Sequence, residues 1–201
     1  MRRIILASKS PRRHELLEMV GIPHEVITSD CDENISSSSP SDMVCKLSSL
    51  KAGAVAEALT SHRQKSDDGK ETSIDSFLVI GSDTIVYLNG TVLGKPRDEK
   101  DAFRMLSELS GNTHSVFTGV TLFDTAAGRK ETFFEETKVT FYDVTEKEIA
   151  DYIKTGDPLD KAGSYGIQGR GAFLVKRIEG DFFTVVGLPV AHLIRTLKEF
   201  D

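Results

Sequence analysis

The sequence of 201 residues has few cysteines and no long apolar segment. Its two cysteines, Cys31 and Cys45, do not have the spacing of a zinc or dithiol site, and we interpret them as free thiols in a reducing compartment. The short basic and apolar start of the chain does not fit a secretion signal, and no segment approaches the roughly 20 apolar residues needed to cross a membrane. We therefore expect a cytoplasmic protein that does not bind membranes.

The sequence also lacks an excess of positive charge. It has 25 lysines and arginines against 31 aspartates and glutamates, which gives a formal net charge of -6. This balance argues against electrostatic binding to a nucleic acid polymer. Basic residues are nevertheless concentrated near the start of the chain, where they suit a small polyanion better than a polymer. They are Arg2, Arg3, Lys9, Arg12 and Arg13.

Two common nucleotide-binding motifs are absent. Gly94-Lys95 has neither the upstream glycine spacing of a phosphate-binding Walker loop nor the Ser or Thr that follows its lysine. Gly169-Arg170-Gly171 lacks the remaining glycines of a Rossmann dinucleotide motif. The sequence therefore disfavours kinase or P-loop chemistry and a dinucleotide site.

Apolar patterning predicts a single domain over residues 1–201 in which strands and helices are mixed. The expected strands are 4–7, 24–28, 77–80, a hairpin of 85–88 and 91–93, 114–123, 132–142, 172–178 and 182–186. The expected helices are 11–20, 41–59, 98–109, 145–155 and 189–200. Residues 60–76 are mostly polar and are expected to form a surface loop. The combination of βα units and hairpins predicts an α/β fold with a mixed twisted sheet and flanking helices.

The segment Ser8-Lys9-Ser10-Pro11-Arg12-Arg13 has the composition of an anion-binding site. It follows a predicted strand and starts a helix, whose first turn carries unpaired N–H groups. Arginine can bind two phosphate oxygens at once. The alternative is an ordinary capped helix with surface arginines.

Two acidic residues are candidates for a metal or proton-transfer site. Asp83, in Gly81-Ser82-Asp83-Thr84, is expected at the carboxyl end of a buried strand, where α/β proteins place ligands. Glu33 lies in an acidic stretch, and with Asp83 it would suit Mg²⁺, which is commonly held by one or two carboxylates and substrate phosphates. The alternatives are an aspartate that caps a turn and a solvated acidic loop.

Two lysines and a glutamine complete the candidates. Lys51 lies in a predicted helix and Lys95 in the turn Gly94-Lys95-Pro96, and either side chain could reach phosphates. Lys51 could instead lay its stem along the helix and direct its ammonium group to solvent. The glycine-rich segment 160–169 is expected to form a fixed loop in which Gln168 reads a base edge, the alternative being an exposed connection.

Together these segments resemble the Maf family of nucleotide pyrophosphatases, and the resemblance covers essentially the whole chain. The matching blocks are 6–13, 81–86, 94–96, 109–111 with His114, 160–169 and 186–189. The resemblance implies hydrolysis of a nucleoside triphosphate between its α- and β-phosphates, which yields the monophosphate and pyrophosphate. It also implies a fold similar to that of inosine triphosphate pyrophosphatase, with two lobes around a central cleft. A divalent cation (Mg²⁺ or Mn²⁺) and a homodimer are implied as well.

The resemblance further implies roles for individual residues. Asp83 matches the family's proton acceptor and, with Glu33, its metal ligands, while Lys51 and Lys95 match positions near metal and phosphates. The residues that match the phosphate-binding motif are Ser8, Ser10, Arg12 and Arg13.

Substrate preference is implied by three positions. Arg12, Thr84 and Gln168 look like the branch of the family that prefers dTTP and UTP. Two other hypotheses remain: a pyrophosphatase for modified nucleotides, and a non-catalytic nucleotide-binding regulator of septation or cell division.

Overall fold

A computed structural model describes residues 3–28, 30–31, 35–61 and 76–200. Its strands are β1 Arg3–Ala7, β2 Glu25–Val26, β3 Phe77–Leu88, β4 Thr91–Leu93, β5 Thr113–Asp124, β6 Lys130–Phe141 and β7 Val175–Glu179. They form one sheet in the order β2-β1-β3-β5-β6-β7, with β4 paired to β3. Strand β1 is parallel to β2 and β3, whereas the pairs β3–β4 and β6–β7 are antiparallel. The sheet is therefore mixed, as predicted.

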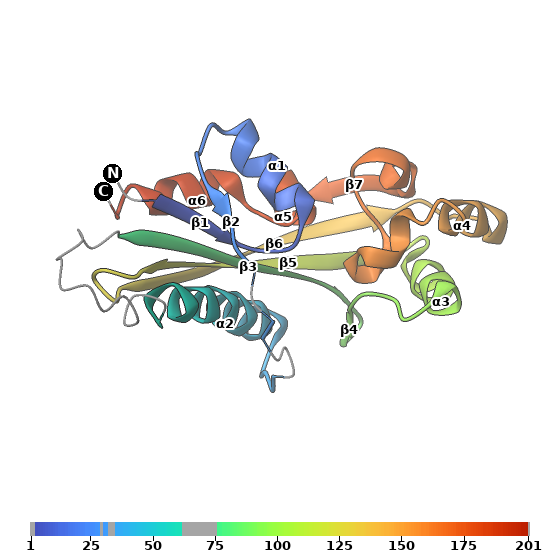
Figure 1. Cartoon of the computed structure of the whole chain (residues 1–201). Helices are drawn as coiled ribbons and strands as arrows, with labels where there is room; N and C mark the ends of the chain where they lie inside the picture. The colour runs from blue at the N-terminus through green and yellow to red at the C-terminus, as the bar shows by residue number, and fades with distance from the viewer. Residues whose placement is uncertain (1–2, 29, 32–34, 62–75, 201) are drawn as a thin grey trace, which may run out of the picture. The chain divides into compact units, whose positions relative to one another are not determined.

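Helices flank this sheet, which confirms the predicted α/β class (Figure 1). The α-helices are α1 Pro11–Met19, α2 Pro40–Ser61, α3 Glu99–Leu109, α4 Glu146–Ile153, α5 Phe182–Val186 and α6 Val190–Leu197. Three 3-10 turns lie between α4 and β7: η2 Asp157–Asp160, η3 Ala162–Ser164 and η4 Gly169–Leu174. No helix within the described ranges is long and apolar enough to cross a membrane.

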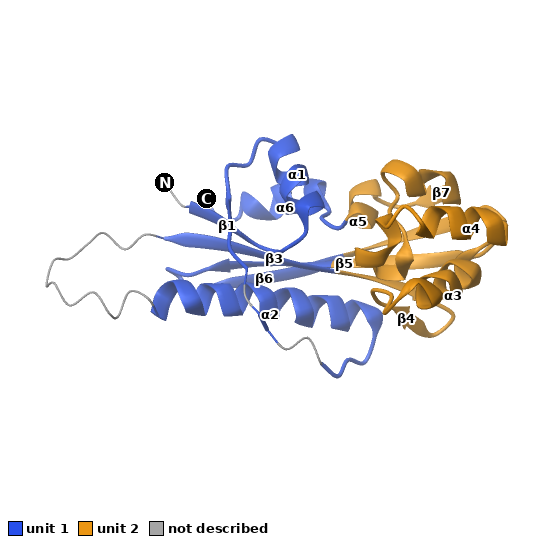
Figure 2. Ribbon diagram, turned by 45° about the vertical axis from the view of Figure 1, so that its right-hand side comes forward, with its two compact units in different colours: residues 1–83, 119–134, 187–201 blue, residues 84–118, 135–186 orange. Residues whose placement is uncertain are grey.

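The chain divides into two compact units (Figure 2). Unit 1 comprises residues 1–83, 119–134 and 187–201, and unit 2 comprises residues 84–118 and 135–186. Strands β3, β5 and β6 contribute residues to both units. Most of the predicted loop, residues 62–75, lies outside the described residues.

In unit 1, α2 lies along one face of the sheet, and α1 and α6 lie on the other (Figure 1). Two glycines allow α2 to approach the strands closely. A Cβ atom at Gly81 on β3 would lie 2.2 Å from the carbonyl oxygen of Ser48, and one at Gly119 on β5 would lie 2.3 Å from that of Val44. The backbone of α2 therefore rests directly on the two strands. Buried apolar side chains of β1, β3 and α2 pack around this contact.

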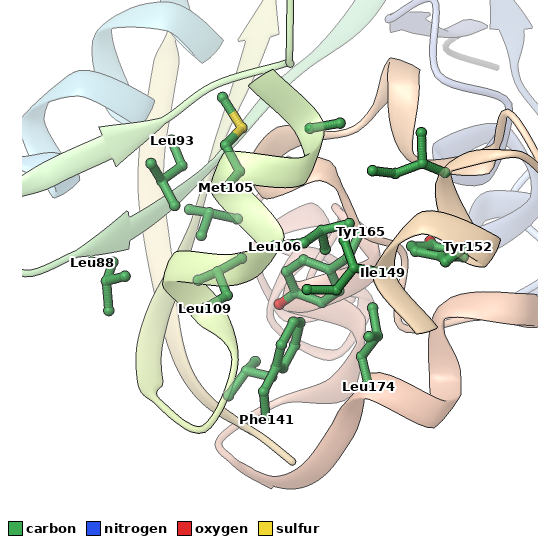
Figure 3. Close-up of a cluster of buried hydrophobic side chains, with 14 of the residues drawn as sticks. Leu88, Leu93, Met105, Leu106, Leu109, Phe141, Ile149, Tyr152, Tyr165 and Leu174 are labelled. Atoms are coloured by element: carbon green, nitrogen blue, oxygen red, sulfur yellow. The ribbon is translucent and has the colours of Figure 1, made fainter. Parts of the chain in front are cut away.

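A separate core of buried apolar side chains fills unit 2 (Figure 3). Helix α3 packs against α4 and against the turns η2 and η3. The rings of Phe141 and Tyr165 meet edge to face at the centre of this core, with centroids 4.8 Å apart. Because Tyr165 follows η3 in the chain, this contact anchors the segment between α4 and β7 to the core.

Local sequence signals predicted several boundaries correctly. The hairpin β3–β4 turns at Asn89 and Gly90, whose φ angles are 48° and 88°, as a tight two-residue turn requires. Thr145 caps α4, and Glu148 completes the capping box. Both motifs depend only on residues that are close in the sequence.

The prediction of a strand over 182–186 is wrong, because these residues form α5. Their aromatic and β-branched side chains favour a strand, but the Asp181 carboxylate accepts hydrogen bonds from the N–H groups of Phe183, at 3.2 Å, and Thr184, at 3.0 Å. This cap starts a helical turn instead. The predicted strands 24–28 and 172–178 are also shorter in the structure, where only β2 and β7 remain.

Candidate functional site

Lys51 and Asp83, both predicted from the sequence, form a partly buried ion pair in unit 1. Lys51 Nζ donates a hydrogen bond to Asp83 Oδ1 at 2.5 Å, and the two side chains are 17% and 12% exposed. Water screens such a pair less than a surface pair, so the two groups restrain each other's position. The ammonium group of Lys51 is therefore directed to Asp83 and not to solvent, and the pair joins α2 to β3.

The position of Asp83 differs from the sequence prediction. Asp83 lies in the middle of β3, which continues to Leu88, and not at the carboxyl end of that strand. The neighbouring strand β1 is shorter, and its last residue, Ala7, pairs with Gly81. Asp83 thus lies just beyond the carboxyl end of β1. The strand end at which α/β proteins place ligands is provided by β1 rather than by β3.

The segment after β1 provides hydroxyl groups. Ser8 is 7% exposed, and its Oγ accepts hydrogen bonds from Ser10 N at 3.2 Å and from Arg13 Nη1 at 3.0 Å. Both bonds use lone pairs of the oxygen, so its hydrogen can still donate to a phosphate oxygen. Ser10 is the N-cap residue of α1 and Pro11 the first helical residue, as predicted, but the Ser10 side chain makes no capping hydrogen bond.

Arg13 is buried, and together with Ser82 it binds the carbonyl group of Gly187. Its Nε donates to the carbonyl oxygen of Gly187 at 2.7 Å, and Ser82 Oγ donates to the same oxygen at 3.1 Å. These bonds join α1, β3 and the segment before α6. On β3 the bond is made by Ser82, the residue next to Asp83. Arg12, the next arginine of the motif, is half-buried. Binding of phosphate by either arginine stays a prediction.

Lys95 belongs to unit 2, in the turn between β4 and α3. It is exposed, and it makes no hydrogen bond or ion pair with the part of the chain that the structure describes. The turn is held by Asp101, whose Oδ2 accepts from Arg97 N at 3.2 Å and from Arg97 Nε at 3.3 Å. Hydrogen bonds from Arg104 contribute most to lowering the pKa of Asp101 to about 2, so this carboxylate is ionised. Lys95 is therefore an exposed lysine on a turn whose backbone is fixed by Asp101.

Thr84 and Gln168 also belong to unit 2. Thr118 Oγ1 donates to the carbonyl oxygen of Thr184 at 2.7 Å, so Thr84 is the donor in the 2.9 Å hydrogen bond between Thr84 and Thr118. Gln168 is exposed, and its amide has no hydrogen-bond partner among the residues that the structure describes. The Gln168 amide is thus available to a ligand, whereas Thr84 is bonded to β5.

Glu33, the second predicted metal ligand, lies outside the described residues. Within residues 3–28, 30–31, 35–61 and 76–200, no three His, Cys, Asp or Glu side chains are grouped so that they could hold a metal ion. Asp83 provides one carboxylate. A single carboxylate fits the way Mg²⁺ is often bound, because substrate phosphates and water supply the other oxygens.

Comparison with known proteins identifies the family. The model of the Maf-like protein family matches residues 3–200. The chain belongs to the Maf family. This Maf protein is 49% identical to a dTTP/UTP pyrophosphatase of Bacillus cereus (strain B4264), and 50% identical to a dTTP/UTP pyrophosphatase of Bacillus thuringiensis subsp. konkukian (strain 97-27). Both alignments extend over 202 residues and cover 100% of this chain and 97% of the relative.

Sequence reasoning missed two contributors to the arrangement in this Maf protein. The carbonyl group of Gly187 accepts hydrogen bonds from Arg13 and from Ser82, and Ser82 and Gly187 are 105 positions apart. Both lie in blocks that carried the family resemblance. Their position in these blocks was the only sequence signal for them, because neither a serine nor a glycine suggests by itself a contact with this arginine segment.

Proposed function

We propose that this Maf protein hydrolyses nucleoside triphosphates to the monophosphate and pyrophosphate, with a preference for dTTP and UTP. The observation that carries the proposal is the partly buried Lys51–Asp83 pair, in the unit that also holds Ser8 and Arg13. Relatives with the name dTTP/UTP pyrophosphatase, aligned over 100% of this chain, support both the reaction and the substrates.

Asp83 is the proton acceptor in this proposal. Lys51 binds one of its carboxylate oxygens, and the lone pairs of the other can take a proton from an attacking water. The ammonium group of Lys51 fixes the carboxylate and places positive charge where phosphate oxygens gain negative charge. Ser8 donates its hydroxyl hydrogen to a phosphate oxygen. We propose that the ammonium group of Lys95 also binds a phosphate oxygen.

The proposed cofactor is Mg²⁺ or Mn²⁺, with Asp83 and Glu33 as its protein ligands. When bound, such an ion polarises phosphate oxygens and neutralises charge on the departing pyrophosphate. The single described carboxylate at Asp83 is compatible with this mode of binding.

Base preference is assigned to Arg12, Thr84 and Gln168. Thymine and uracil present both a donor and an acceptor on their imide edge, and the exposed amide of Gln168 offers the complementary pair. The free thiols of Cys31 and Cys45 support a cytoplasmic location, where nucleotide pools are found. The homodimer implied by the family resemblance stays a prediction, which light scattering would test.

Product analysis tests the reaction. The purified protein is incubated with canonical and modified nucleoside triphosphates in the presence of Mg²⁺ or Mn²⁺, and pyrophosphate and orthophosphate are measured separately. Pyrophosphate is expected as the first product, released fastest from dTTP and UTP. Equal rates with ATP and GTP would contradict the pyrimidine preference, and orthophosphate as the first product would contradict cleavage between the α- and β-phosphates. No release from any substrate would favour the non-catalytic regulator.

The Asp83→Asn variant tests the role of the carboxylate. Asparagine keeps the shape of the side chain and an oxygen that accepts from Lys51, but it is a poor proton acceptor, so turnover should fall by about 10²–10⁴-fold. Asp151→Asn is the control, because Asp151 on α4 is also paired with lysines, Lys147 and Lys154, but is exposed. The control should keep full activity. Near-native turnover by Asp83→Asn would refute the assignment.

A further inference from the structure

The loop that carries Gln168 is held at several points within unit 2. Gly163 N donates to the carbonyl oxygen of Gly94 at 3.0 Å, in the turn that carries Lys95. The buried hydroxyl of Tyr165 is hydrogen-bonded to His114 Nε2 at 2.8 Å. Figure 3 shows Tyr165 directed into the core of unit 2. The part of the loop before Gln168 is therefore anchored to the protein.

Tyr152, on α4, contacts the loop on both sides of Gln168. Its hydroxyl donates to Asp157 Oδ2 at 2.8 Å and accepts from Gly166 N at 3.2 Å. A Cβ atom at Gly171 would lie 2.6 Å from the same hydroxyl oxygen and 2.3 Å from the carbonyl oxygen of Gly166. The hydroxyl group is thus bonded to the backbone before Gln168 and lies against the backbone after it, where Gly171 leaves no room for a side chain.

Lys161 and Asp157 complete this network. Lys161 Nζ donates to Asp157 Oδ1 at 3.0 Å and to Asp160 Oδ1 at 2.7 Å, and its side chain is only 11% exposed. Its stem packs against Gly166, where a Cβ atom would lie 2.9 Å from Lys161 Cε. Burial raises the pKa of the Tyr152 phenol, so the hydroxyl keeps its proton and donates to Asp157.

We propose that Tyr152 is a positioning residue for base recognition, whose hydroxyl fixes residues 166–171 so that the Gln168 amide faces the pyrimidine in one orientation. The identity of the base rests on the proposed function. Tyr152 is itself buried, at 3% exposure, and acts through the loop rather than by touching substrate. An exposed glutamine on a held backbone loses less conformational freedom on binding than one on a loose loop, which favours the matching base.

The Tyr152→Phe variant tests this role because it removes only the hydroxyl and leaves the ring in the core. We expect kcat/KM for dTTP to fall about fivefold, the size expected for one neutral hydrogen bond. The change should appear mainly in KM, and the ratio of kcat/KM for dTTP to that for dCTP should fall with it. Tyr142→Phe is the matched control, since Tyr142 is 52% exposed and lies outside the loop, and it should leave both values unchanged. In a Gln168→Ala background, Tyr152→Phe should cause no further loss of selectivity.

Hydrogen exchange gives a readout that does not depend on activity. The Gly166 amide, which donates to Tyr152, should exchange about fivefold faster in Tyr152→Phe than in the wild-type protein. Unchanged Gly166 exchange would overturn the positioning role. Faster exchange with an unchanged dTTP to dCTP ratio, or a further loss of selectivity in the Gln168→Ala background, would overturn the role in recognition. Absence of pyrophosphate release by the wild-type protein would overturn the proposed function and the recognition role, whereas Gly166 exchange would still report on the network.

Discussion

Substitution of Gly81 by alanine tests how the Lys51–Asp83 pair is held together. The new Cβ atom would lie 2.2 Å from the carbonyl oxygen of Ser48, 2.8 Å from Ala52 N and 2.9 Å from Ala52 Cβ. All three atoms belong to α2, and two of them are backbone atoms, so rotation of a side chain cannot relieve the overlap. Helix α2 has to move away from β3, and Lys51 moves with it.

The size of the effect follows from these distances. Non-bonded heavy atoms need a separation of about 3.5 Å, so the overlap with the Ser48 oxygen is on the order of 1 Å. Overpacking of this kind lowers the free energy of unfolding by about 1–3 kcal/mol. A displacement of about 1 Å at groups that orient the reaction lowers turnover on the order of 100-fold. We therefore expect Gly81→Ala to reduce both stability and turnover, because it separates Lys51 from Asp83.

The assay combines urea unfolding with pyrophosphate release from dTTP on the same protein preparations. Gly53→Ala is the control, because Gly53 lies on the same helix and a Cβ atom there would meet the flexible tip of Lys130 at 3.7 Å. Replacement of a helical glycine by alanine stabilises by up to about 1 kcal/mol, and activity should be retained. If Gly81→Ala is as stable and as active as the wild type, close packing of α2 on β3 does not position Lys51.

Two further predictions concern stability. Burial lowers the pKa of His114 to about 4, against about 6.5 in the unfolded chain. Above pH 6.5 the histidine is neutral in both the folded and the unfolded chain. As the pH falls below about 6.5, the unfolded chain binds a proton at this histidine more readily than the folded chain does. The free energy of unfolding therefore falls between about pH 6.5 and pH 4, by about 2 kcal/mol at about pH 5. Urea unfolding at about pH 7.5 and pH 5 should show a smaller loss for His114→Phe than for the wild type, and equal losses would contradict the shift. Asp181→Ala removes the acceptor for the N–H groups of Phe183 and Thr184 and should lower the free energy of unfolding by about 1 kcal/mol. An unchanged urea midpoint would show that α5 does not need this cap.

The sequence by itself determined the elements whose signals are local. The turn at Asn89 and Gly90 and the capping box of Thr145 and Glu148 need only backbone angles and hydrogen bonds among neighbouring residues, so their residue types were sufficient to predict them. The sequence also contained the chemical groups of the candidate site, since carboxylate, ammonium and hydroxyl groups such as those of Asp83, Lys51 and Ser8 are recognisable by type and motif. Local composition was misleading at 182–186, where the Asp181 carboxylate outweighed the strand preference of its neighbours.

Only the tertiary structure decided which of these groups meet. Lys51 and Asp83 are 32 positions apart, and Arg13 and Gly187 are 174 positions apart. The hydrophobic pattern of a single element does not predict which helix packs on which strand. Here α2 packs on β3 at Gly81, and this contact depends on how the sheet and the helices pack as a whole. The lengths of paired strands also depend on tertiary packing. Because β1 ends at Ala7 while β3 continues to Leu88, Asp83 lies beside the end of β1 although it is in the middle of β3.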